Sequence, residues 1–415
     1  MSLNTDFVRS HFPALGPENA FFDAPGGTQV PQYVVDRMAH YLLQTNANHG
    51  GTFRTSMESD AVIEETRHGL AAFFNAPDPS TIVFGPNMTS LTLSMSRALG
   101  RSLEPGDELV VTRLDHDANI SPWLLVAEDR GCTVRWIDFD VETCTLNLDD
   151  LQRAITPRTR LVAVGYASNA VGTINPVADI VRAAHGVGAL CFVDAVQYAP
   201  HGTIDVQSLD CDFLVASAYK FYGPHLGVLF GKPEHLESLR AYKVRPAPND
   251  PPGKFETGTQ NHEGIAGALG ALEYIASLGT PGLSPGSLPP TRTHLIEGME
   301  AISAYERILT TRLLGQLTAI QGVRVFGLTE AETLAHRVPT VSIRVEGVPP
   351  REAASALAGR GMYLWDGNFY ALAVTERLGV EAEGGLLRIG LAHYNTLEEV
   401  DRLVEAIADL AAKGT

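Results

Sequence analysis

Polar residues that could do chemistry follow five short apolar segments of this sequence. They are Thr89, His116, Asn169, Asp194 and Lys220. A hydroxyl at a helix start helps to bind an anion, a carboxylate that ends an apolar strand normally has a cationic partner, and a lysine beside a buried strand is a candidate amine nucleophile. Taken singly, each residue also has an ordinary explanation as a helix cap, a loop residue or a surface lysine.

The apolar segments themselves predict parallel strands. Runs that are apolar on both faces alternate with helix-like stretches, such as 90–99 and 177–185, which is typical of a parallel sheet covered on both sides. We expect a doubly wound α/β domain over residues 20–278. Its strands are expected at residues 81–84, 108–112, 134–137, 161–166, 189–193, 213–216 and 227–230.

In such a sheet, ligands bind beyond the carboxyl ends of the strands, so the five polar residues should meet at one edge. Together they match what pyridoxal phosphate needs: a helix start for the phosphate, an aspartate for the ring nitrogen and a lysine for the covalent bond. Competing motifs are absent, since Gly186-Val187-Gly188 precedes a strand and neither GxxxxGK[ST] nor HExxH occurs. We expect no metal site.

A second region follows the stretch 279–290, GTPGLSPGSLPP, whose prolines and glycines predict an irregular linker. Residues 291–321 read as a long amphipathic helix, and alternating strands and helices follow to the end of the chain. We expect residues 1–19 and 291–415 to form a smaller α+β domain. Its later elements are expected at 323–326, 340–345, 351–360, 387–391 and 397–412.

Composition narrows the class of protein. The 415 residues carry a net charge of −17, which disfavours nucleic acid as a general partner. Four cysteines without a CxxC pair favour a reducing compartment, and the first residues do not resemble a secretory signal. With no apolar run long enough to span a membrane, we expect a cytoplasmic protein.

Several longer strings resemble the class V aminotransferases, and most closely their cysteine desulfurase and selenocysteine lyase branch. The strings are FFDAPGGTQVP, GDELVVTRLDHDANISPW, YASNAVGTINPVADI, FVDAVQYAPHGTIDVQSLDCDFLVASAYKFYGP, KFETGTQN and GLLRIGLAHYNTLEEVDRL. The resemblance covers nearly the whole chain. It implies a pyridoxal 5'-phosphate-dependent homodimer of fold type I, with a mixed, mostly parallel seven-stranded sheet, helices on both faces and a smaller α+β domain.

The resemblance also implies a role for individual residues. Lys220 would bond the cofactor, His116 would stack on its ring and Asp194 would pair with its nitrogen, so these three are the expected catalytic residues. The other expected cofactor contacts are Met88, Thr89, Asn169, Gln197, Ser217, Tyr219 and, from the partner subunit, Thr259. The substrate would meet Arg388, Asn169, Gly26 and Trp365. Arg388 and Asn169 would hold its α-carboxylate, although Arg388 in the apolar strand LLRIGL could instead form a structural ion pair.

The sequence departs from this family in two places. Tyr219 stands where the family usually has a histidine before the lysine, and a phenol can still donate to phosphate. The segment 361–370, where a desulfurase carries its nucleophilic cysteine, has none, and Cys191 and Cys211 belong to core strands or lie beside them.

We therefore expect an enzyme of small α-amino acids with desulfurase-like C–S lyase chemistry, which proceeds by elimination rather than by persulfide transfer. A class V aminotransferase or an amino-acid epimerase is the alternative, because both reactions start from the same carbanion. An alternative of another class is a non-catalytic partner protein that kept the fold.

Overall fold

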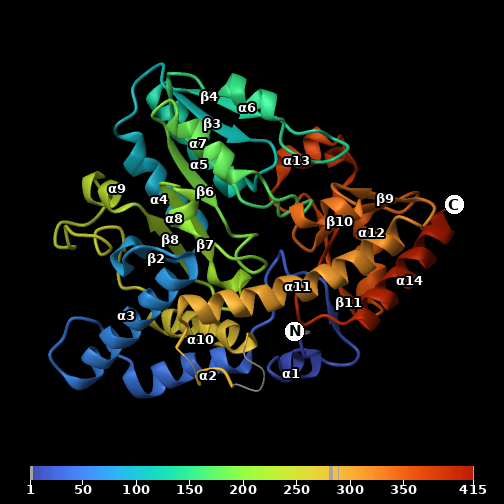
Figure 1. The fold of residues 1–415 in the computed structure, drawn as a ribbon, viewed down its shortest axis with the longest axis horizontal. Helices are drawn as coiled ribbons and strands as arrows, with labels where there is room; N and C mark the ends of the chain where they lie inside the picture. The colour runs from blue at the N-terminus through green and yellow to red at the C-terminus, as the bar shows by residue number, and fades with distance from the viewer. Residues whose placement is uncertain (1–2, 280–283, 288, 415) are drawn as a thin grey trace.

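The computed structural model describes residues 3–279, 284–287 and 289–414. Seven of its strands form one sheet: β2 (Ile82–Gly85), β3 (Glu108–Thr112), β4 (Thr133–Ile137), β5 (Thr159–Gly165), β6 (Leu190–Asp194), β7 (Phe213–Ser217) and β8 (Gly227–Gly231). The order across the sheet is β2-β8-β7-β6-β5-β3-β4 (Figure 1). All neighbours pair in parallel except at β8, which is antiparallel to both β2 and β7. The predicted mostly parallel seven-stranded sheet is confirmed.

Both faces of this sheet are buried. Val110, Val162 and Val193 pack into one core, whereas Leu109 and Leu161 pack into another. Because successive side chains of a strand point to opposite faces, this alternation explains why the strands are apolar throughout. The first core is covered by α3 (Arg54–Phe74), α7 (Val177–His185) and α10 (His262–Leu278), and the second by α4 (Met88–Gly100) and α5 (Ser121–Arg130).

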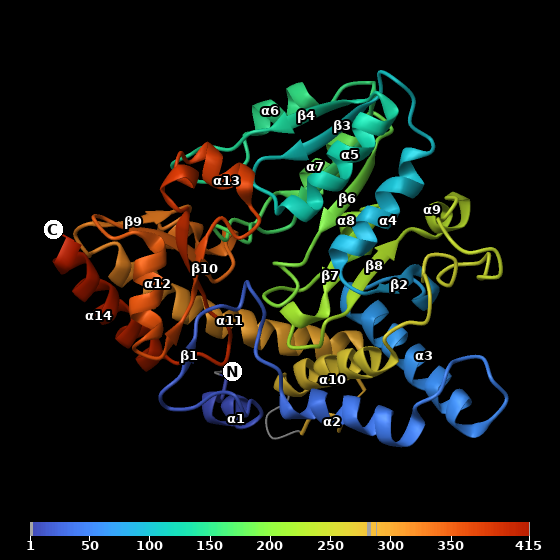
Figure 2. The same cartoon turned by 180° about the vertical axis from the view of Figure 1, so that it is seen from behind.

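A separate, smaller antiparallel sheet follows later in the chain. Its strands, in spatial order, are β12 (Trp365–Gly367), β13 (Leu386–Gly390), β10 (Thr340–Val345) and β9 (Val323–Phe326). Its core is completed by α11 (Arg292–Leu317), α12 (Pro350–Ala358) and α14 (Leu397–Gly414). In Figures 1 and 2, α11 runs from beside α10 to the small sheet, so one helix belongs to both halves of the molecule.

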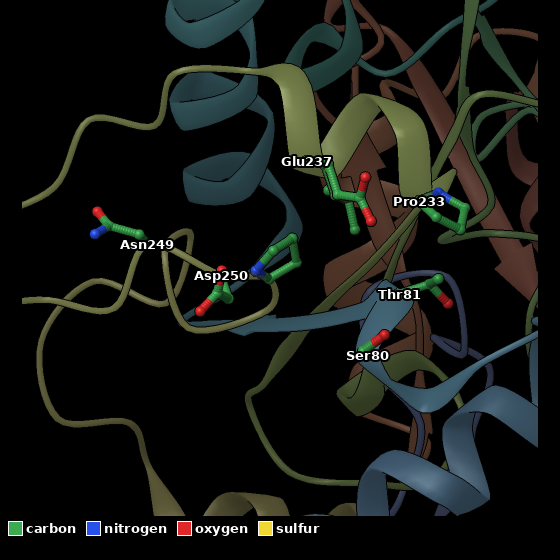
Figure 3. A pocket seen from close by; sticks show the side chains of 8 residues that line it. Ser80, Thr81, Pro233, Glu237, Asn249 and Asp250 are labelled. Atoms are coloured by element: carbon green, nitrogen blue, oxygen red, sulfur yellow. The ribbon is translucent and has the colours of Figure 1, made fainter.

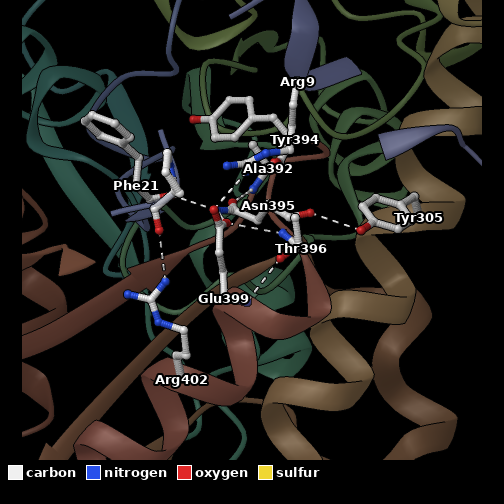
Figure 4. A network of polar contacts seen from close by, with 10 residues as sticks. Arg9, Phe21, Tyr305, Ala392, Tyr394, Asn395, Thr396, Glu399 and Arg402 are labelled. Atoms are coloured by element: carbon white, nitrogen blue, oxygen red, sulfur yellow. Dashed lines mark hydrogen bonds and ion pairs between the residues drawn. The ribbon is translucent and has the colours of Figure 1, made fainter. Parts of the chain in front are cut away.

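The N-terminal segment is tied to the C-terminal end of the chain. Its β1 (Ala20–Phe21) pairs in parallel with β11 (Met362–Tyr363). Arg9 donates to the Tyr394 carbonyl and to Glu399, and Asn395 donates to the Phe21 carbonyl (Figure 4). The remaining helices are α1 (Thr5–Ser10), α2 (Gln32–His40), α6 (Leu148–Ala154), α8 (Val206–Leu209), α9 (Pro233–Ser238) and α13 (Leu372–Arg377).

The division of the chain at residues 278 and 291 stays a prediction. Of the predicted linker 279–290, residues 280–283 and 288 lie outside the described residues. Packing near the N-terminus is mixed, since Val8 and Phe12 join the core beneath the large sheet while Ala20 and Phe22 join that of the small sheet. In the part of the chain that the structure describes, no helix is long and apolar enough to cross a membrane.

Candidate active site

Lys220 lies in a short 3₁₀ turn, Ala218–Lys220, just past the carboxyl end of β7. Its side chain is buried, and Nζ donates to the Pro25 carbonyl. Burial lowers the pKa of Lys220 to about 7, helped by the positive charge of Arg388 and opposed by Asp23 and Asp194. A lysine with such a pKa is partly unprotonated at neutral pH, which a nucleophilic amine requires.

Asp194 ends the neighbouring strand β6 and is also buried. The Val196 backbone N–H donates to its Oδ1 at 2.9 Å. Burial raises the pKa of Asp194 to about 7, the Asp115 carboxylate adds to the rise and Lys220 opposes it. A carboxylate with so little compensation is suited to a cationic ligand such as a protonated ring nitrogen.

His116 follows β3 in the loop that faces these two residues. Its Nδ1 accepts from the Ala118 N–H at 3.0 Å, and burial together with the charge of Lys220 lowers its pKa to about 4. The imidazole is therefore neutral at pH 7. Asp115 anchors this loop, since Thr112 and Asn119 donate to its two oxygens at 2.7 and 2.8 Å.

The start of α4 follows β2 at the same edge. The Asn87 side chain caps the helix by accepting from the Ser90 N–H at 2.9 Å, and the Met88 N–H donates to Ser217 Oγ at 3.1 Å. Thr89 is exposed beside these groups. A side chain in place of Gly227 would collide with the Asn87 backbone, so this glycine lets the turn lie against β8. The N-terminal N–H groups and hydroxyls fit a phosphate.

Arg388 reaches the site from β13 of the small sheet and is 4% exposed. Its Nη1 donates to the Asn169 carbonyl at 3.1 Å and its Nη2 to Asp23 Oδ1 at 3.2 Å. At this contact, the buried Arg388 Nε and Asn169 Oδ1 have no hydrogen-bond partner among the described residues. The ion pair that the sequence left open therefore exists, and beside it stand a free donor and a free acceptor.

A turn that follows β12 covers this arrangement. The Phe369 ring lies over the Arg388 guanidinium at 4.3 Å, and the Tyr370 ring stacks on His116 at 5.7 Å. Both residues adopt left-handed backbone conformations, with φ of 57°. The turn is held from the large half, because Asn169 Nδ2 donates to the Phe369 carbonyl at 2.8 Å and the Asp117 N–H to the Tyr370 carbonyl at 2.6 Å.

The other predicted residues have more ordinary surroundings. Gln197 Nε2 donates to Thr340 Oγ1 at 3.0 Å, and the Tyr219 ring stacks on His225 at 5.0 Å. Trp365 is 55% exposed and donates to Asp23, next to the turn that contains Gly26. Among the described residues, no hydrogen bond or ion pair joins the exposed Thr259 to this edge.

Sequence reasoning missed Asp23, Asp115 and Phe369. Asp23 and Asp115 stand in strings that signalled the family, but nothing in the hydrophobic pattern brings residue 23 next to residue 388. A bridge between Asp23 and Gly390 does so. Phe369 had no signal beyond its place in a stretch of aromatic residues.

A surface hollow of about 480 Å³ lies elsewhere on the molecule (Figure 3). It is lined by Ser80 and Thr81 before β2 and by Pro233, Glu237 and Asp250 after β8. Because β8 is antiparallel, both groups stand at the amino edge of the sheet, opposite Lys220. None of the predicted site residues lines this hollow.

Comparison with known proteins identifies the family of this chain. The family model for class V aminotransferases matches residues 20–282 and 294–403. An aminotransferase-like protein of Gibberella zeae is 35% identical, with 98% of each chain covered. A cysteine desulfurase of Dickeya dadantii is 32% identical, with 97% of this chain and 95% of that protein covered.

Solved structures are similar throughout the chain. The cysteine desulfurase of Thermococcus onnurineus gives a TM-score of 0.88 at 28% identity, over 100% of this chain and 99% of that one. A cysteine desulfurase of Escherichia coli gives 0.85 at 30% identity, with the same coverage. The chain therefore belongs to the class V aminotransferase family and is a pyridoxal-phosphate-dependent enzyme of that family.

Proposed function

We propose that this enzyme holds pyridoxal 5'-phosphate at the carboxyl edge of the large sheet and cleaves a C–S bond of a small α-amino acid by elimination. The observation that carries the proposal is the pairing of opposite pKa shifts at neighbouring strand ends. The pKa of Lys220 is lowered to about 7 and that of Asp194 is raised to about 7, both by burial. Groups tuned in this way are typical of acid–base sites.

Each residue has a task in this proposal. When bound, pyridoxal phosphate would take up the electrons left at Cα. Asp194 holds the proton on the ring nitrogen, and His116 offers a neutral ring to stack upon. Lys220 Nζ, once free, takes the Cα proton. Arg388 and Asn169 orient the α-carboxylate through the free Nε and their neighbouring groups.

The phosphate end is held by the α4 start. Thr89 is exposed at the helix terminus, and beside it the Met88 N–H donates to Ser217 Oγ. Gln197 would contact the ring on the side of its phenolic oxygen, and the Tyr219 phenol would donate to the phosphate. With the carboxylate and the phosphate held in this way, the sulfur-bearing side chain of the substrate would point toward Trp365 and the turn at Phe369.

The cysteines favour elimination over persulfide transfer. Cys144, Cys191 and Cys211 are buried, and burial raises the pKa of Cys144 and Cys211 to about 12 and that of Cys191 well above its usual value. Burial also raises the pKa of Cys132. A thiolate nucleophile is therefore disfavoured at every cysteine. In the segment before β13, strand β12 carries Trp365 and Asp366 instead, and a carboxylate cannot hold transferable sulfur.

The test combines products with a cysteine-free variant. With cysteine as substrate and one water consumed, elimination yields sulfide, ammonia and pyruvate in equal amounts. Replacing all four cysteines with alanine should leave this turnover within a few-fold, provided the fold survives. An enzyme-bound persulfide detected by mass spectrometry would contradict the proposal, and a new amino acid formed from an added keto acid would indicate transamination.

We further propose a homodimer in which Thr259 of one chain reaches the phosphate site of the other. Support comes from the exposure of Thr259 and from large apolar side chains exposed on this chain, among them Leu42, Leu43, Phe53 and Met57 around α2 and α3. Patches of this kind commonly mark interfaces. Sedimentation of the loaded enzyme at micromolar concentration should give twice the chain mass.

A further inference from the structure

The guanidinium of Arg388 is only partly satisfied. Nη1 is committed to the Asn169 carbonyl and Nη2 to one oxygen of Asp23, while Nε has no partner among the described residues. Nε and Nη2 together form the edge of an arginine that binds a carboxylate with two parallel bonds. One half of that edge is free, and Asp23 holds the other half.

The same molecule shows what the complete contact looks like. In the Arg312–Asp401 pair, Nε donates to Oδ1 at 2.8 Å and Nη2 to Oδ2 at 3.0 Å. The bond from Arg388 to Asp23 is single and longer, at 3.2 Å. A ligand that made both bonds would fit the edge of Arg388 better than Asp23 does.

Asp23 lies on a segment that spans the site. Ala24 N–H donates to the Gly390 carbonyl at 3.4 Å, two residues from Arg388, and the Pro25 carbonyl accepts from Lys220. The carboxylate of Asp23 is therefore fixed between the arginine and the lysine. Its backbone position does not depend on its bond to Arg388, because the neighbouring backbone is tied to β13.

Four groups face the Asp23 carboxylate. Arg388 from β13 and Lys220 from the turn after β7 are cationic, the Trp365 indole of β12 donates a hydrogen bond, and the Tyr394 phenol lies close enough to interact electrostatically. Burial nevertheless raises the pKa of Asp23 above its usual value. Its ionised form depends on keeping Arg388 as a partner.

We propose that Asp23 is an internal carboxylate that occupies the carboxylate subsite of Arg388 while the site is empty, and that the α-carboxylate of the substrate enters by displacing it. This inference rests on the proposed function in one respect, which is that the entering ligand is the carboxylate of an amino acid. Asp23 acts through Arg388 as a positioning residue. It lowers affinity for every carboxylate by competition, and the displaced group takes up a proton.

Propionate is the probe, because it has neither the amine nor the sulfur of a substrate and binds irrespective of the reaction catalysed. Calorimetric titration of the pyridoxal-phosphate-loaded enzyme should show that propionate affinity falls as pH rises, over a range where propionate stays ionised. In Asp23→Asn, affinity should increase about tenfold and depend less on pH. Asp401→Asn removes an equal charge from the Arg312 pair and should leave propionate binding within twofold of wild type.

The proposal fails if Asp23→Asn binds propionate equally or more weakly with the wild-type pH dependence, or if neither protein binds it. Should that variant not fold, Trp365→Phe removes one donor from Asp23 at an exposed position and should raise affinity by two- to threefold. Unchanged affinity and pH dependence there would overturn the proposal. Arg388→Leu must abolish propionate binding in either case, and a failure of the elimination chemistry would leave all these results standing.

Discussion

Two aspartates at opposite ends of neighbouring strands have pKa values that are shifted in opposite directions. Asp194 stands at the carboxyl end of β6, and Asp212 stands just before β7, at the amino edge of the sheet. Both are buried, at 7% and 3% exposure. Yet burial raises the pKa of Asp194 to about 7, whereas hydrogen bonds from His235 and His185 outweigh burial at Asp212 and hold its pKa at about 2.

The surroundings explain the difference. Asp212 lies 2.8 Å from His235 Nε2 and 2.9 Å from His185 Nε2, accepts from the Cys191 N–H at 2.7 Å and has Lys232 at 3.4 Å. At Asp194, a single backbone N–H and a more distant lysine face the carboxylate, and Asp115 repels it. The amino edge is thus satisfied by the protein alone, while the carboxyl edge is left to be completed by a ligand.

The largest effect on activity is expected at the carboxyl edge of the sheet. Lys220→Ala should reduce turnover by about 10²–10⁴-fold, the usual contribution of a positioned acid–base group, and abolish the visible absorption of the bound cofactor. The thermal midpoint should move by no more than a few degrees. If Lys220→Ala reduced the amount of folded protein but left the turnover per folded molecule unchanged, the role of Lys220 would be structural.

At the amino edge, the expected effect is on stability alone. Asp212→Asn should lower the free energy of unfolding by about 2–3 kcal/mol at pH 7. Because the folded pKa of Asp212 is depressed, its contribution is present above the unfolded pKa and is lost as pH falls from about 4 to about 2. Urea titrations at several pH values should therefore show the two proteins converge in acid. If Asp212→Asn also changed the turnover per folded molecule, the amino edge of the sheet would contribute to activity as well as to stability, against this prediction.

A smaller loss of stability is expected when one of the partners of Asp212 is removed. His185→Leu removes one of several donors to Asp212 and should cost about 1 kcal/mol in the same titrations, because His235, Lys232 and the Cys191 N–H remain. A loss as large as that of Asp212→Asn would mean that the cluster acts as one indivisible unit.

The strand ends were predictable because apolar runs mark a sheet buried on both faces. Every expected strand of the large sheet forms, and the residues at its carboxyl edge follow from strand direction alone. The contrast between Asp194 and Asp212 was not predictable. Both flank apolar runs in the sequence, and only the fold brings His185 and His235 to one of them.

The contacts between the halves were also beyond sequence reasoning. Asp23 contacts Arg388, which lies 365 residues later in the sequence, because an isolated β-bridge joins Asp23 to Gly390. The hydrophobic pattern of the sequence does not predict this bridge. The helices α2, α3 and α10 were not assigned individually, since α10 is buried along nearly its whole length and shows no polar face. Local pattern specifies elements, whereas the partners of buried charges depend on tertiary packing.

The turn at Phe369 and Tyr370 has a consequence for motion. It follows β12 of the small sheet, but Phe369 packs against the core beneath the large sheet, and the two carbonyls of the turn are held by Asn169 and Asp117. Left-handed conformations at two consecutive non-glycine residues cost of order 1–3 kcal/mol each, which these bonds offset. Because Phe369 lies over Arg388 and Tyr370 stacks on His116, opening of this turn would break both bonds and uncover both residues in the same movement. This one turn would then control access to Arg388 and to His116 together.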